Sequence, residues 1–227
     1  MKYFTLVWIL LFGIGAMDAS MAKPLPVAKA ERVGMSSERL DRITAMTQKY
    51  VDEGKLAGVI TMVARDGKLV HFEAVGNKGA DDPRPLEKDD LFRIYSMTKP
   101  ITATAAMQLY EQGKFHMNDP VHKFIPEFKD LKVLNENGEQ VPVKNHMTMQ
   151  QLLSHTTGLS YGFDPINDPV DKLYVEAKLW EHENLDALMQ TVSKLPLKFE
   201  PGSAWHYSIA VDVTGAVIER ISGQSFD

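Results

Sequence analysis

The feature that most constrains the fold is a hairpin signal centred on the dipeptide Asp66-Gly67. Residues 58–65 are mostly apolar and β-branched, and residues 68–75 form a second run of this kind. Asp-Gly accepts the positive backbone angles of a two-residue turn, so the two runs are predicted to pair as antiparallel strands. A lone two-stranded hairpin is marginally stable in water. Because few strand-like runs follow, either helices cover the hairpin or its partner strands lie beyond Asp227.

Most of the remaining sequence carries helical patterns. A helix is expected to begin after Ser36 or Ser37 as N-cap and to end before Gly54. Residues 81–85 are predicted to form a polar, proline-rich loop. Apolar periodicity and capping residues predict four further helices: 97–112 closed by Gly113, 149–154 with a capping box from Thr148 and Gln151, 184–193, and 210–222 closed by Gly223.

The first 22 residues have the layout of a secretory signal peptide. Lys2 precedes an apolar stretch over residues 3–16, and small residues follow up to Ala22. About 14 apolar residues fall short of the roughly 20 that a spanning helix needs, which favours cleavage between Ala22 and Lys23 over an uncleaved anchor. The mature chain is therefore expected to be periplasmic or secreted, with no membrane span.

Composition and charge exclude several function classes. The chain has 44% hydrophobic and 24% charged residues, as folded globular proteins do. Its 25 Lys+Arg against 30 Asp+Glu give a net charge of −5, which offers no cationic field to a nucleic acid. Cysteine is absent, which excludes disulfides and thiol nucleophiles, and the seven histidines lack zinc-site spacing. We expect no nucleic-acid partner, metal or cofactor, and the oligomeric state stays open.

A candidate catalytic motif is the tetrad Ser96-Met97-Thr98-Lys99 at the start of a predicted helix. Residues three apart lie on one helix face, so the Lys99 amine is expected beside the Ser96 hydroxyl. A serine becomes a nucleophile when an adjacent base takes its proton, and a lysine with a lowered pKa can do so. The tetrad alone is weak, because about one match is expected by chance in a chain of this length. Residues 20–23 also match it, and a plain N-cap serine would explain Ser96.

The surrounding sequence strengthens the assignment. Residues 92–102, FRIYSMTKPIT, resemble the active-site segment of the serine β-lactamase-like superfamily, which includes class C β-lactamases, D-alanyl-D-alanine carboxypeptidases and family VIII carboxylesterases. The resemblance continues in order through further blocks, at residues 118–121 with 124–128, 152–159 and 205–208. It implies an α/β fold in which residues 23–90 form the N-terminal part of an α/β domain with an antiparallel sheet, and residues 91–227 form a mainly helical domain.

The resemblance implies roles for three residues. Ser96 would be the acylated nucleophile and Lys99 its hydrogen-bonded activator. Tyr207 matches the tyrosine of the family's Y-x-N or Y-S-x motif, which moves a proton between nucleophile and leaving group. Such a phenol must be held partly as phenolate, or near a cation such as Lys99, to act at neutral pH. A packed core aromatic is the alternative for Tyr207.

Ile209 departs from many β-lactamases, which place there an asparagine that contacts substrate and the catalytic lysine. An isoleucine side chain makes no hydrogen bond. The run from Tyr207 to Val213 looks more like family VIII esterases. The sequence therefore predicts a serine hydrolase that acts through an acyl-enzyme, carboxylesterase-like on small esters, with β-lactamase or D-alanyl-D-alanine peptidase activity as the alternative.

A second serine motif, Gly158-Leu159-Ser160-Tyr161-Gly162, fits the G-x-S-x-G nucleophile elbow of α/β-hydrolases. That motif needs a strand before it and a helix after it. Here a predicted helix precedes it and a proline-containing run follows, so Ser160 is expected in a loop without a catalytic role. His155 is expected to make a structural hydrogen bond at a helix end, and His206 to lie near the pocket.

The superfamily's third motif, K-T-G, H-x-G or W-x-G, does not occur in the sequence. In the family it lies on a later strand whose backbone supplies one oxyanion-hole N–H. We therefore expect a truncated member of the family, lacking the C-terminal strands and the final helix of the α/β domain. Loss of one oxyanion donor costs roughly 10²–10³ in rate. A non-catalytic, penicillin-binding-like remnant is accordingly the second hypothesis.

Overall fold

The computed structural model describes residues 23–226, so the predicted signal peptide at residues 1–22 lies outside the described residues. The chain divides into two compact units, the first ending at Phe92 and the second beginning at Arg93. No helix of the described residues is both long and apolar enough to cross a bilayer.

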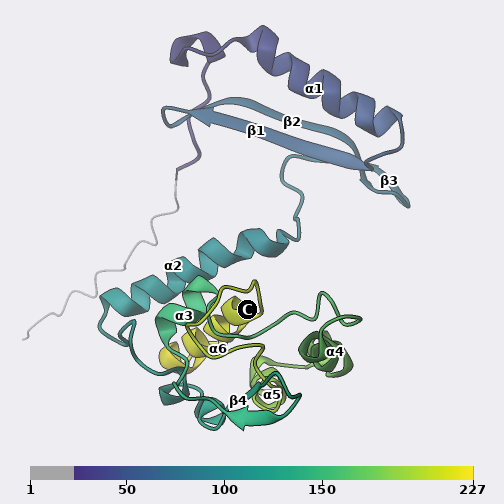
Figure 1. Cartoon of the computed structure of the whole chain (residues 1–227). Helices are drawn as coiled ribbons and strands as arrows, with labels where there is room; N and C mark the ends of the chain where they lie inside the picture. Colours follow the sequence, from purple (N-terminus) through teal and green to yellow (C-terminus); the bar gives the residue numbers. More distant parts are fainter. Residues whose placement is uncertain (1–22, 227) are drawn as a thin grey trace, which may run out of the picture. The chain divides into compact units, whose positions relative to one another are not determined.

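The first unit is a three-stranded antiparallel sheet with a helix packed along it (Figure 1). Strands β1 (Gly58–Arg65) and β2 (Lys68–Gly79) form the predicted hairpin. Asp66 and Gly67 both have positive φ angles, 50° and 67°, as a type I′ turn requires. Helix α1 (Ser37–Asp52) follows a short 3-10 turn (Ala30–Val33) and has Ser36 as its N-cap, whose hydroxyl accepts the Arg39 N–H.

Strand β3 (Asp82–Pro85) corrects the prediction of a loop at residues 81–85. It pairs with the far end of β2, where Asn77 lies opposite Pro85 and Gly79 opposite Asp82. Proline lacks an N–H donor, but β3 is an edge strand of this sheet, where one side of the strand has no partner to bond. β2 consequently extends to Gly79 rather than ending at Val75, and the hairpin has both a third strand and α1 as partners.

The second unit is mainly helical and encloses one apolar core. The predicted helices are confirmed to within about two residues at each end. The helices of this unit are α2 (Thr98–Glu111), α3 (Met149–Ser154), α4 (Pro169–Glu176), α5 (Leu185–Val192) and α6 (Ala210–Ser222). Short 3-10 turns occur at Tyr95–Met97, Val121–Lys123, Pro126–Phe128 and Leu179–Glu181. Helix α4 and the small antiparallel pair β4 (Lys132–Leu134) and β5 (Gln140–Pro142) were not predicted.

Helix α6 lies at the centre of this unit and packs against α2, α3 and α5 (Figure 1). Its inner residues Ala210, Val213, Ala216 and Val217 are almost fully buried. Small and β-branched side chains let neighbouring helices approach closely, and Gly223 ends the helix in the left-handed conformation at φ 71°. Because α6 begins three residues after Tyr207, its packing against α2 helps to fix where that tyrosine lies.

Candidate active site

Ser96 lies in the 3-10 turn Tyr95–Met97 that leads directly into α2. The preceding residue, Tyr95, has a φ of 45°, a left-handed conformation that few non-glycine residues adopt and that is often found at functional sites. Lys99 follows in the first turn of α2, and its Nζ donates a hydrogen bond of 3.3 Å to Ser96 Oγ. The spacing of the tetrad thus produces the expected contact.

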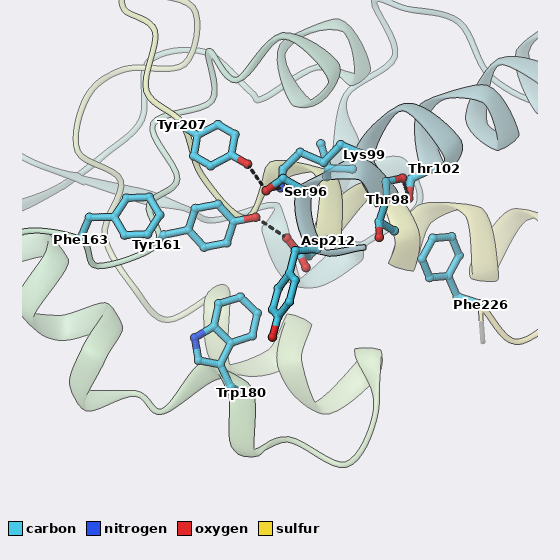
Figure 2. A pocket seen from close by; sticks show the side chains of 12 residues that line it. Ser96, Thr98, Lys99, Thr102, Tyr161, Phe163, Trp180, Tyr207, Asp212 and Phe226 are labelled. Atoms are coloured by element: carbon cyan, nitrogen blue, oxygen red, sulfur yellow. Dashed lines mark hydrogen bonds between the residues drawn. The ribbon is translucent and has the colours of Figure 1, made fainter. Parts of the chain in front are cut away.

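Tyr207 meets the same serine from a distant part of the chain. Its hydroxyl oxygen lies 2.8 Å from Ser96 Oγ (Figure 2). The Lys99 Nζ lies 4.7 Å from the centre of the Tyr207 ring. The structure therefore brings together all three residues that the resemblance singled out, with the serine oxygen between an amine and a phenol.

The electrostatics of this triad favour a reactive phenol. The Lys99 ammonium, and after it the hydrogen bond with Ser96, hold the pKa of Tyr207 below its usual value. A neighbouring cation stabilises the phenolate because opposite charges attract. Since Lys99 donates to Ser96 Oγ, the serine can direct its own proton toward Tyr207.

His155 supports the segment that carries Tyr207. It occupies the C-cap of α3 with a φ of 56°, and its carbonyl accepts the His206 N–H at 2.9 Å. Its Nδ1 accepts the Ser208 N–H at 3.3 Å, and its ring centre lies 4.9 Å from that of Tyr207. Burial, with the charges of Lys99 and His206, lowers the pKa of His155, so the ring is a neutral acceptor. This is the structural role at a helix end that the sequence predicted.

A second tyrosine and a carboxylate complete the site, and the sequence reasoning did not find them. Tyr161 donates a hydrogen bond of 3.1 Å to Asp212, which lies in the first turn of α6 (Figure 2). Burial raises the pKa of Asp212, although the bond from Tyr161 opposes the shift. Burial and the Asp212 charge also raise the pKa of Tyr161, so it stays a protonated donor. The pKa of Tyr161 is therefore raised while that of Tyr207 is lowered, as is common for two groups in one site that handle protons differently.

These groups line an open pocket of about 400 Å³. Half of its lining residues are aromatic. The lining is drawn from the turn before α2 and the start of α2, the loop after α3, the turn near residue 180, the segment that leads into α6, and Phe226. The lining residues are Tyr95, Ser96, Thr98, Lys99, Thr102, Tyr161, Phe163, Trp180, Tyr207, Val211, Asp212 and Phe226. Within residues 23–226, no group of three or more histidine or acidic side chains is placed to hold a metal ion.

Ser160, the serine of the G-x-S-x-G motif, lies outside this pocket in a buried loop position. Its hydroxyl donates to Asp171 and accepts the Gly162 N–H at 3.1 Å. Asp171 also accepts from Lys198 Nζ at 2.9 Å. The motif serine is therefore occupied in a buried network with no solvent access, which agrees with the predicted loop position.

His206 was expected near the pocket. It adjoins the lining residue Tyr207, but its own side chain does not line the pocket, and its Nε2 lies 3.3 Å from Ser160 Oγ. Tyr207 thus contacts Ser96, whereas its chain neighbour His206 contacts the buried loop at Ser160.

Comparison with known proteins gives a consistent result. The sequence profile described as Beta-lactamase matches residues 43–227. Esterase EstB of Burkholderia gladioli is 35% identical over 185 residues, which cover 81% of this chain and 45% of EstB. The solved structure of EstCE1, a hydrolase with promiscuous acyltransferase activity, matches with a TM-score of 0.68 and 29% identity, covering 83% of this chain and 49% of EstCE1. Unliganded simvastatin synthase (LovD) from Aspergillus terreus matches with a TM-score of 0.67 and 26% identity, and the match covers 84% of this chain and 50% of LovD. The chain thus spans about half the length of these relatives.

Proposed function

Because this chain belongs to the β-lactamase family, we propose that its Ser96 is the nucleophile of a serine hydrolase that cleaves small carboxylic esters through an acyl-enzyme. One observation carries the proposal. Ser96 Oγ lies 3.3 Å from Lys99 Nζ and 2.8 Å from the Tyr207 hydroxyl, within hydrogen-bonding reach of both. A serine so placed can lose its proton as it attacks.

The proposed reaction uses these residues in two half-reactions. Ser96 Oγ attacks the carbonyl carbon of the ester while its proton passes to the Tyr207 phenolate, which the Lys99 ammonium stabilises. The bond from that carbon to the alcohol oxygen then breaks, and Tyr207 returns the proton to the leaving alkoxide. In the second half, Tyr207 takes a proton from water, the hydroxide attacks the acyl carbon, and the carboxylic acid leaves as Ser96 recovers its proton.

The side chain at position 209 supports an ester rather than a β-lactam or peptide substrate. Ile209 is 1% exposed and packs in the core, so it presents no polar group to the pocket. EstB carries the name of an esterase, which supports the same choice. β-Lactamase or D-alanyl-D-alanine peptidase activity remains the alternative that a substrate screen would detect.

The location of the reaction is a further part of the proposal. The layout of residues 1–22 supports export with cleavage after Ala22, which places the site in the periplasm or outside the cell. Amino-terminal sequencing of the protein recovered from a periplasmic extract tests this. A chain that begins at Lys23 is expected, and a chain that keeps its first residues would contradict export by cleavage.

Reaction with a fluorophosphonate tests the proposed nucleophile. The purified chain is exposed to the reagent and its intact mass is measured, with Ser96→Ala and Ser160→Ala as matched variants. We expect one adduct on the unmodified chain and on Ser160→Ala, and none on Ser96→Ala. Absence of an adduct on protein shown by circular dichroism to be folded would reject the activity of this chain. An adduct that survives Ser96→Ala and disappears in Ser160→Ala would assign the nucleophile to the other serine.

A further inference from the structure

Three aromatic residues form a continuous surface at the edge of the pocket. Tyr161 lies 5.2 Å from Phe163 and 5.9 Å from Trp180 between ring centres, and its ring stacks on that of Trp180 with an angle of 24°. Figure 2 shows Phe163 beside Tyr161 and Trp180 below it, with the Tyr161 hydroxyl pointing toward Asp212. We call Tyr161, Phe163 and Trp180 the aromatic platform.

The platform leaves a large apolar area open to solvent. Phe163 and Trp180 are each 68% exposed, although the core of the unit to which they belong is closely packed. Aromatic side chains carry a large hydrophobic area, so exposing two of them beside a candidate nucleophile is costly unless a ligand covers them. Phe163 also lies parallel to Tyr207 within 9°, with 6.3 Å between ring centres, so the platform is continuous with the proposed proton carrier.

The charges in the pocket favour a neutral ligand. Lys99 is the one cation among the described lining residues, and it is engaged by Ser96 and by the Tyr207 and Tyr161 rings. Asp212 adds a carboxylate on the same side as Tyr161. A substrate carboxylate would meet no free cation here and would be repelled by Asp212.

We propose that the aromatic platform binds a neutral, flat ring of the substrate, so that the preferred substrates are uncharged aromatic esters. The inference rests on the proposed function for the position of the bond to be cleaved. Ring stacking raises affinity by roughly 2- to 12-fold beyond the effect of buried area, which separates a flat ring from a saturated ring of similar size.

Binding without turnover tests the inference. In Ser96→Ala, the affinities for methyl phenylacetate, methyl cyclohexylacetate and sodium phenylacetate are measured by ligand-observed NMR. We expect the aromatic ester to bind roughly 2- to 12-fold more tightly than the saturated ester, and the anion to bind more weakly than either. The added Trp180→Ala substitution should abolish the preference for the flat ring.

Trp205 offers a matched control, because it is 66% exposed but does not line the pocket. Ser96→Ala with Trp205→Ala should keep the full preference. Equal affinities for the two esters, or an equal loss in both tryptophan variants, would overturn the inference. A preference for the aromatic ester in a chain that forms no fluorophosphonate adduct would keep the platform and reject the proposed hydrolase. An adduct on Ser96 without a preference for the aromatic ester would keep the proposed hydrolase and reject the platform.

Discussion

The Tyr207 hydroxyl lies 2.8 Å from Ser96 Oγ, although 111 residues separate the two in the sequence. Ser96 lies in the 3-10 turn that leads into α2, and Tyr207 lies three residues before the start of α6. These two helices pack against each other. The contact is therefore a product of the core of the second unit. Substitutions that loosen this core should act on the site as well as on stability.

Lys99→Met should slow the reaction of Ser96 with the fluorophosphonate. The substitution keeps a long side chain but removes the ammonium that donates to Ser96 Oγ and stabilises the Tyr207 phenolate. Loss of such a proton-handling group costs roughly 10²–10⁴ in rate. The rate of adduct formation, followed by intact mass, measures the effect. Lys114→Met, at an exposed lysine outside the pocket, should react at the original rate. Equal rates for the two variants would show that Lys99 plays no part in activation.

The rate of adduct formation should rise with pH through the pKa of Tyr207. Hydrogen bonds with Lys99 and then with Ser96 lower the pKa of Tyr207. The increase in reaction rate should therefore occur at a pH below the ordinary tyrosine pKa near 10. Deprotonation produces the acceptor for the serine proton, which fixes the sign of the change. In Lys99→Met the rise should move to higher pH, and in Tyr207→Phe it should disappear. If the pH profile of the rate in Tyr207→Phe equals that of the unmodified chain, the titration belongs to another group.

The sequence alone predicted much of the local structure. The turn at Asp66-Gly67 has the expected backbone angles, α3 begins at the predicted capping box of Thr148 and Gln151, and α6 ends at the predicted Gly223. These signals are local, since a cap or a turn depends on residues within a few positions of each other. Asp168 and Pro169 form an N-cap signal of the same kind, and they could have predicted α4.

Non-local contacts explain what the sequence left out. Strand β3 contains two prolines and is extended because of its pairing with β2, which no local pattern at residues 82–85 indicates. Helical spacing predicted the contact between Ser96 and Lys99, but the place of Tyr207 came from the family resemblance alone. The Tyr161–Asp212 pair spans 51 residues and matches no motif that was recognised, so it required the fold.

Lys198→Met should destabilise the second unit by roughly 3 kcal/mol, because it removes one partner of a buried ion pair. Lys198 Nζ lies 2.9 Å from the buried Asp171 and 2.7 Å from Asp168. Urea unfolding followed through Trp180 and Trp205, which both belong to this unit, measures the change. The control is Lys172→Met, an exposed lysine 4.0 Å from Glu176, which should change stability by less than about 1 kcal/mol. Similar losses of stability in Lys198→Met and Lys172→Met would show that the buried ion pairs of Lys198 do not stabilise the unit.

The same network predicts the response to acid. Burial tends to raise the pKa of Asp171, but bonds from Ser160 and Lys198 outweigh it and leave the pKa below its usual value. A carboxyl with a lowered pKa in the folded state stabilises above its unfolded pKa, and that stability is lost as the pH falls through the folded pKa. The second unit should therefore lose stability in acid below about pH 4. The stability of Asp171→Asn should fall less between neutral pH and acid than that of the unmodified chain. An equal fall in both would contradict the role of Asp171 in the acid response.

Gly158→Ala should cost more stability than Gly113→Ala. Both glycines have positive φ angles, 83° and 70°, so both substitutions strain the backbone by about 1–2 kcal/mol. At Gly158 an added Cβ would also clash with the Phe199 carbonyl oxygen, whereas at Gly113 it would meet nothing within 4 Å. The urea midpoint should fall at least about twice as far for Gly158→Ala. Equal shifts would show that the loop carrying Tyr161 moves freely to accept the methyl group.

The most direct measurement of the central claim is the position of the acyl group during turnover of an ester. The chain is mixed with 4-nitrophenyl acetate, quenched in acid and digested, and the peptides are sequenced by tandem mass spectrometry. The account predicts an acetyl group on Ser96, slower formation of that acetylated peptide in Tyr207→Phe because the phenol accepts the serine proton during attack, and no acetyl serine in Ser96→Ala. Release of 4-nitrophenol with no acetyl group on Ser96, or with the acetyl group on Ser160, would contradict it.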